Sequence, residues 1–174
     1  VAAGALAVFI LYLSLLATSV PPTDAERQKI DAAIDVLEAK GFEQEAFLLR
    51  HLTVFRKSDN WLNGVAESEN AYAATNFPFG IMTLYPDFYE KATDDTERAM
   101  VLLHEARHIE GADERQAYTY VWQNRAKLGW TTLTHGTTPT YVTIELQTRE
   151  NAPELFKCSS KLWNDCTERM RASR

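Results

Sequence analysis

The spacing of apolar side chains predicts a helical hairpin near the start of the chain. Apolar positions recur every three or four residues over Asp24–Ala39 and again over Glu43–Lys57, which is the period of one face of an α-helix. Gly41 lies between the two segments and is a natural helix stop. We therefore expect two helices that fold back on each other.

The next part of the chain changes from polar to aromatic and β-forming. Residues 58–70 are polar and predict a loop. Ala71–Tyr89 is rich in aromatic and β-forming residues and is interrupted by two prolines and a glycine. This composition predicts one or two short strands, such as Phe79–Leu84.

Two more helices are expected after this region. Acidic and hydroxyl residues over Thr93–Glu97 are typical of a helix start, and the helix is expected to run to Gly111. A further helix follows over Ala112–Leu128. Residues 130–148 predict a loop and a strand, and Pro153–Arg171 predicts a final polar helix. The fold class is therefore α+β and mainly helical, with a short sheet.

The first residues form an apolar segment. Val1–Val20 contains no charged residue and, at a rise of ~1.5 Å per residue, reaches across a hydrocarbon core of ~30 Å. We predict a transmembrane anchor, with a cleaved signal peptide and a buried core helix as the alternatives. Asp24 and Glu26, the first charges after it, favour export of the C-terminal side. We expect a single-pass membrane protein whose domain over 21–174 is periplasmic or extracellular, or is secreted if the segment is cleaved.

Two cysteines, Cys158 and Cys166, would suit one disulfide in an exported domain. On one unbroken helix they would lie ~12 Å apart along the axis, beyond the ~7 Å limit between the Cα atoms of a bridge. A disulfide therefore requires a turn between them, and the sequence leaves the pairing open. Because no Cys-x-x-Cys spacing exists, we do not expect a thiolate metal site.

Length and charge limit the classes of function. The chain has 174 residues and a formal net charge of −6, which suits one globular domain. Its acidic residues are scattered, and no cluster of lysine and arginine with interleaved aromatic residues is present. We therefore do not expect nucleic acid as a partner. The sequence gives no indication of the oligomeric state.

Residues 104–108 carry the strongest chemical signal, because they contain two histidines four positions apart in the predicted helix. His104 and His108 then project from one face, ~6 Å apart along the axis, and both imidazoles can bind one ion. Glu105, next to the first histidine, is placed to take a proton from water on a zinc ion and pass it to a leaving amine. The pattern predicts a zinc site with Glu105 as general base.

A catalytic zinc ion needs a third protein ligand and one open position. On a straight helix Glu114 would lie ~9 Å beyond His108 along the axis, but a bend at Gly111 would return it to the ion. Glu114 shares a predicted helix face with apolar residues, and a carboxylate on a buried face needs a partner. We therefore favour Glu114 as the third ligand. The other candidates are His135, Glu145, Asp113 and Glu110.

The segment from Val101 to Glu114 resembles the active-site helix of the zincin metallopeptidases, with features of both the metzincin and the gluzincin patterns. The resemblance covers about a dozen residues and implies a zinc-dependent peptidase acting on a peptide or protein. It implies that strand Phe79–Leu84 binds an extended substrate, and it makes Tyr118, His135 and Tyr141 candidates for stabilising the oxyanion. Arg107 departs from the family pattern, and we expect it to pair with Glu110 or to face the substrate.

Two other classes of function remain as alternatives. One is a non-catalytic, membrane-tethered helical domain that binds a protein partner and has a structural histidine pair. The other is a metallohydrolase that uses the same site on a non-peptide amide or ester. His51 lies on the second predicted helix and is expected to be an ordinary surface or partly buried histidine.

Overall fold

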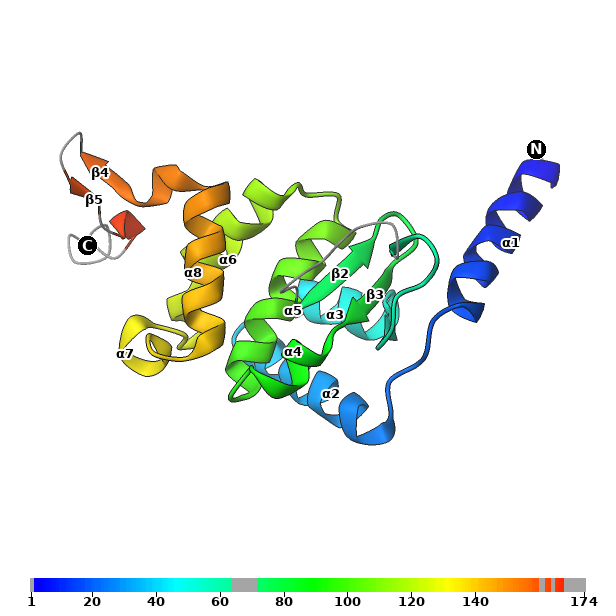
Figure 1. Cartoon of the computed structure of the whole chain (residues 1–174), viewed down its shortest axis with the longest axis horizontal. Coiled ribbons are helices and arrows are strands. Elements are labelled where there is room, and N and C mark those ends of the chain that lie inside the picture. The colour runs from blue at the N-terminus through cyan, green and yellow to red at the C-terminus, as the bar shows by residue number, and fades with distance from the viewer. Residues whose placement is uncertain (1, 64–71, 160–161, 164, 168–174) are drawn as a thin grey trace.

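The computed structural model describes residues 2–63, 72–159, 162–163 and 165–167. Figure 1 shows a mainly helical body with short strands, which agrees with the predicted α+β content. The elements in chain order are α1 (Ala2–Ala17), α2 (Asp24–Ala39), α3 (Glu43–His51), β1 (Val54–Arg56), β2 (Ala73–Asn76), β3 (Ile81–Leu84), α4 (Pro86–Glu90), α5 (Asp95–Ile109), α6 (Glu114–Leu128), α7 (Thr132–His135), α8 (Pro139–Asn151), the 3-10 helix η2 (Pro153–Leu155), β4 (Lys157–Ser159) and β5 (Leu162–Trp163).

Helix α5 is the centre of the body. It packs against α2, α3, α6 and β2, and α8 covers α6 (Figure 1). The helix begins after Asp94, whose side chain accepts a hydrogen bond from the Glu97 backbone at 2.9 Å, as expected of an N-cap residue. Met100, Leu102 and Leu103 are fully buried. A helix that buries several faces holds its polar side chains in fixed positions.

The predicted helix over Asp24–Ala39 is confirmed with its bounds. The second predicted helix is too long, because α3 ends at His51 and Phe55 lies on β1. Phe55 occupies the register position opposite Met82 of β3 and is buried. Burial in the sheet therefore decides the conformation of a segment whose apolar spacing also suits a helix.

The three-stranded sheet has the order β1-β3-β2, with β1 parallel and β2 antiparallel to β3. The predicted strand Phe79–Leu84 corresponds to β3, which is the central strand. Because both of its edges are already paired, β3 has no free edge for an extended substrate. The expectation that Phe79–Leu84 binds an extended substrate is therefore wrong. Strands β1 and β2 are the two outer strands of the described sheet, and β2 packs against α5.

The strand expected within residues 130–148 is absent from the described fold, where α7 and α8 take its place. Val142 and Leu146 are exposed whereas Ile144 is buried. Residues four apart share a helix face and the residue between them lies on the opposite side, so this alternation fits a helix as well as a strand. Thr138 caps the helix through the backbone N–H of Tyr141.

The end of the chain forms a hairpin in place of the predicted polar helix over Pro153–Arg171, of which 160–161, 164 and 168–171 lie outside the described residues. Strands β4 and β5 are antiparallel. Cys166 is disulfide-bonded, and the sequence contains a single other cysteine, Cys158. The reversal of the chain supplies the turn that such a bridge requires. Of the loop predicted over 58–70, residues 64–70 also lie outside the described part.

The prediction of a membrane anchor over Val1–Val20 is wrong. Helix α1 has 16 residues, which span ~24 Å and fall short of a ~30 Å hydrocarbon core. Among the residues that the structure describes, none of the helices has both the length and the apolar character needed to cross a membrane. The predicted fold class was therefore wrong in its transmembrane helix. The predicted single-pass membrane localisation is not supported either.

Candidate metal centre

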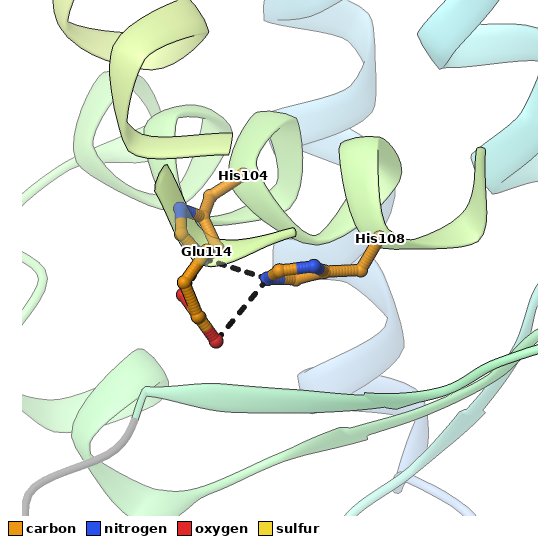
Figure 2. A group of neighbouring side chains, drawn as sticks. All are labelled: His104, His108 and Glu114. Carbon is orange, nitrogen blue, oxygen red and sulfur yellow. Dashed lines mark hydrogen bonds and ion pairs between the residues drawn. The ribbon is translucent and has the colours of Figure 1, made fainter. Parts of the chain in front are cut away.

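Three side chains converge at the junction of α5 and α6. Figure 2 shows His104, His108 and Glu114 turned toward one another. The Nε2 atoms of the two histidines are 3.0 Å apart. The Glu114 carboxylate lies 3.3 Å from Nε2 of His104 and 3.5 Å from Nε2 of His108. These are the three residues that the sequence favoured as ligands.

The three side chains lie close enough together to share one metal ion. Bonds of about 2.0–2.2 Å at the tetrahedral angle place two donor atoms about 3.3–3.6 Å apart. The two histidine nitrogens are 3.0 Å apart, Oε2 of Glu114 lies 3.3 Å from His104, and Oε1 of Glu114 lies 3.5 Å from His108. With one donor atom taken from each residue, the three atoms lie within 4.8 Å of one another. Two imidazole nitrogens and one carboxylate suit zinc and other first-row transition metals better than magnesium or calcium, which prefer oxygen ligands. The donor set by itself does not distinguish zinc from its neighbours in that series.

A tight turn brings Glu114 back to the histidines. Gly111 has φ +85°, a left-handed conformation that glycine adopts without strain. The chain then enters α6, where the Asp113 side chain accepts a hydrogen bond from the backbone of Gln116 at 2.8 Å. Glu114 is the first residue of α6. Because α6 starts immediately after the turn, its first side chain reaches the face of α5 that carries the histidines.

A backbone carbonyl sets the orientation of one imidazole. Nδ1 of His108 lies 2.9 Å from the carbonyl oxygen of Ala112. Since a carbonyl oxygen only accepts, Nδ1 carries the proton and donates, which leaves Nε2 of the neutral ring with a lone pair for a metal. The ring of His104 packs against Tyr118, with the centroids 4.3 Å apart. Both rings are therefore held before any ion binds.

Electrostatic coupling links the three groups. Burial lowers the pKa of His108, but the hydrogen bond to Glu114 and the charge of Glu105 outweigh it and raise the pKa to about 9. Hydrogen bonds with His104 and His108 lower the pKa of Glu114. Because a metal ligand must be a neutral imidazole, an ion that bound to Nε2 of His108 would displace a proton from this ring.

Glu105 is positioned by a strand of the sheet. Its Oε2 accepts a hydrogen bond of 2.7 Å from the hydroxyl of Thr75 on β2. Glu105 is only 6% exposed, yet it borders the two cavities beside the metal centre. A buried carboxylate with one oxygen held by a hydroxyl has a fixed orientation, and its other oxygen is the one available to a substrate or to water.

Two cavities meet at the metal centre. The first, which we call the α8 cavity, lies between β2, α5, α6 and α8, has a volume of about 290 Å³, and borders His104, Glu105 and Glu114. The second, which we call the turn cavity, has a volume of about 420 Å³ and lies between β2 and the turn at Gly111; it borders His108, Glu105 and Glu114. Ala73 of β2 borders both. The candidate metal centre, formed by His104, His108 and Glu114, therefore lies along a cleft that follows β2.

The four other candidates for the third ligand lie in different interactions. Asp113 caps α6, and Glu110 pairs with Arg107 and accepts a hydrogen bond from Gln44. His135 pairs with Asp94 at 2.9 Å, and Glu145 pairs with Arg149 at 2.6 Å. None of these four belongs to the cluster of possible ligands found among the described residues.

Glu114 lies beside the histidines, but not on the buried helix face that the sequence predicted for it. Its side chain is 61% exposed, so it does not lie on a buried face of α6. The turn at Gly111 brings it to the site.

Arg107 pairs with Glu110 and stacks on Tyr120, with its guanidinium carbon 4.5 Å from the ring centroid. It borders neither cavity.

Of the three aromatic candidates for oxyanion stabilisation, only Tyr118 borders the centre. Burial and the charges of Glu114 and Glu105 raise its pKa, so it remains a protonated donor at neutral pH. Tyr141 is buried against Thr132, and His135 pairs with Asp94. The role of Thr75 could not be predicted from the sequence, because Thr75 lies 30 positions from Glu105.

Comparison with known proteins adds nothing to this geometry. No family model, no curated protein and no solved structure matches the chain. The resemblance over Val101–Glu114 therefore stays a prediction from the sequence, and the case for a function depends on the geometry of the site.

Proposed function

We propose that the protein is a zinc-dependent peptidase in which His104, His108 and Glu114 hold the ion and Glu105 is the general base. The observation that carries this proposal is the cluster of three possible ligands, whose donor atoms lie within 4.8 Å of one another, beside a buried carboxylate that borders the cleft. Structural zinc sites are usually closed by four protein ligands, many of them cysteine. Three nitrogen and oxygen donors leave one position for chemistry.

The reaction divides between the ion and the chain. A bound zinc ion supplies Lewis acidity, lowering the pKa of water and polarising a carbonyl. Glu105 accepts a proton from the attacking water and delivers it to the leaving amine, with its other oxygen held by Thr75. Tyr118 borders the same cavity and is protonated, so its hydroxyl is the candidate donor to the developing oxyanion.

An extended peptide suits the shape of the cleft. Strand β2 is one of the two outer strands of the described three-stranded sheet and supplies Ala73 to both cavities. An outer strand offers backbone N–H and C=O groups to a segment that lies alongside it. The substrate would therefore lie along β2, with the cleaved bond facing the metal centre and side chains entering the cavity on each side. This assigns to β2 the role that the sequence suggested for Phe79–Leu84.

Metal removal tests the proposal directly. The chain, treated with a chelator and incubated with a mixed peptide library, should cleave nothing, and cleavage followed by mass spectrometry should return as zinc is added, reaching a plateau at about one equivalent. Magnesium should not restore it, because it disfavours imidazole ligands. Stoichiometric zinc binding without cleavage of any peptide would favour the non-catalytic alternative. Cleavage that persists in excess chelator would refute the proposal.

Thr75→Val is expected to lower kcat about tenfold, with a smaller change in KM. The substitution keeps the shape of the side chain but removes the hydroxyl that holds Glu105, and outer partners of this kind typically contribute about 10–100-fold. Steady-state kinetics on one peptide substrate measures the effect. Thr75→Ser keeps the hydroxyl and should retain most of the activity. Equal losses in the two variants would show that packing of β2, and not the hydrogen bond, is responsible.

A further inference from the structure

The α8 cavity has a chemical character that the metal centre does not explain. One end borders His104 and Glu105, and the other end is formed by α8. Its walls include the apolar side chains of Met100, Val101 and Ile144, which lie on α5 and α8. A pocket of this kind accepts an apolar chain of several carbon atoms that starts at the metal centre.

A carboxylate lies at the α8 end of this cavity. Glu150 borders the cavity and is exposed to solvent. Its side chain makes no hydrogen bond or ion pair with any residue that the structure describes, whereas Glu145 on the same helix pairs with Arg149. Lys91, which borders a neighbouring cavity together with Glu150, pairs with Asp87 at 2.6 Å. The charge of Glu150 is therefore not neutralised within the described chain.

A second polar group at the same place also lacks a partner. Tyr72 borders the α8 cavity and the neighbouring one. The residue is only 6% exposed, and its hydroxyl has no hydrogen-bond partner among the described residues. A buried polar group usually finds a partner in the protein, in water or in a ligand. The wall that carries Glu150 is thus suited to a ligand with hydrogen-bond donors.

We infer that the α8 cavity selects a substrate with a lysine or arginine next to the cleaved bond, and that Glu150 pairs with its cationic group. This inference rests on the proposed function, because it takes the metal centre as the place of cleavage. A lysine or arginine side chain combines an apolar stem with a charged end, and such residues bury the stem while the charge stays near water. None of the described residues that border the cavity is a lysine or arginine that would repel it.

Peptide binding tests the inference without cleavage. The probes are fluorescein-labelled octa-alanine peptides that carry one lysine, arginine, norleucine or glutamate, measured by fluorescence anisotropy on the zinc-loaded Glu105→Gln chain. The lysine and arginine peptides should bind about fivefold more tightly than the norleucine peptide, and the glutamate peptide more weakly. The preference should decrease as salt is added, because the pair is partly exposed.

Two matched substitutions locate the effect. In the same background, Glu150→Gln should bring the ratio of lysine to norleucine affinity to about one, and Glu150→Lys should reverse it in favour of the glutamate peptide. Glu145→Gln makes the same charge change on α8 outside the cavity and should keep the ratio. Equal binding of all four peptides, or a preference that survives Glu150→Gln, would overturn the inference. Cleavage by the wild-type chain without a cationic preference would overturn it and leave the peptidase proposal standing. Cationic selectivity without cleavage of any peptide would support the pairing with Glu150 but contradict both the peptidase proposal and the place next to a cleaved bond.

Discussion

Replacing Glu105 by glutamine is expected to lower kcat by at least about 10²–10⁴-fold while zinc still binds at one equivalent. General base catalysis contributes an effect of this size. Glutamine has nearly the same shape as glutamate and can still accept the hydrogen bond from Thr75, but it cannot take a proton from water. Steady-state kinetics together with metal analysis of the purified variant measures both quantities.

The control for this variant keeps the same chemical change but moves it away from the cleft. Glu145→Gln on α8 removes one negative charge from a side chain that pairs with Arg149 and borders neither cavity. Its kcat should remain within about twofold of the wild type, because surface charge changes usually have small effects. If Glu105→Gln retained wild-type activity with zinc bound, Glu105 would not be the base.

Replacing His104 by alanine is expected to weaken zinc binding by at least about 100-fold. The change removes one of the three donors. Mutation of a residue that only hydrogen-bonds to a metal ligand already lowers metal affinity about 10–100-fold, so loss of a ligand itself should have a larger effect. The two remaining donors, His108 and Glu114, cannot complete a catalytic site. Competition with a chromogenic chelator measures the affinity, and peptide cleavage should be lost in parallel.

Two further variants separate loss of a ligand from loss of the fold. His104 is mostly buried and packs on Tyr118, so its removal also disturbs packing. Glu114 is 61% exposed, and Glu114→Gln should weaken zinc binding without lowering the melting temperature. His51→Ala removes a histidine that lies outside the cluster and should leave zinc affinity unchanged. Stoichiometric zinc of wild-type affinity in His104→Ala would rule out the proposed ligand set.

The sequence determined the parts of the fold and of the site that depend on local geometry. The helix over Asp24–Ala39 was predicted with its bounds, because the apolar period is a local signal; the capping box between Thr23 and Glu26 that the structure shows is local too. The convergence of His104 and His108 follows from their spacing of four on any regular helix. Glu105 was a candidate for the same reason, since its place next to His104 does not depend on the rest of the fold.

Tertiary structure decided the features that join distant parts of the chain. Phe55 lies on a strand because β3 is there to bury it, and residues around Ile144 form a helix because α8 packs on α6. Glu114 reaches the histidines because Gly111 adopts a positive φ and the chain reverses. Its exposure shows that the sequence argument from a buried helix face was wrong.

The hydroxyl of Thr75 and the carboxylate of Glu150 could not be recognised from the sequence at all. Thr75 contacts Glu105 across 30 positions, and Glu150 borders a cavity whose other walls come from β2, α5 and α6. The length of α1 likewise depends on where the helix ends, which the apolar composition of Val1–Val20 does not specify. The sequence thus determined the two histidines and the acid of the motif through helix geometry, whereas the third ligand, the orientation of the base and the shape of the cleft required the packing of distant segments.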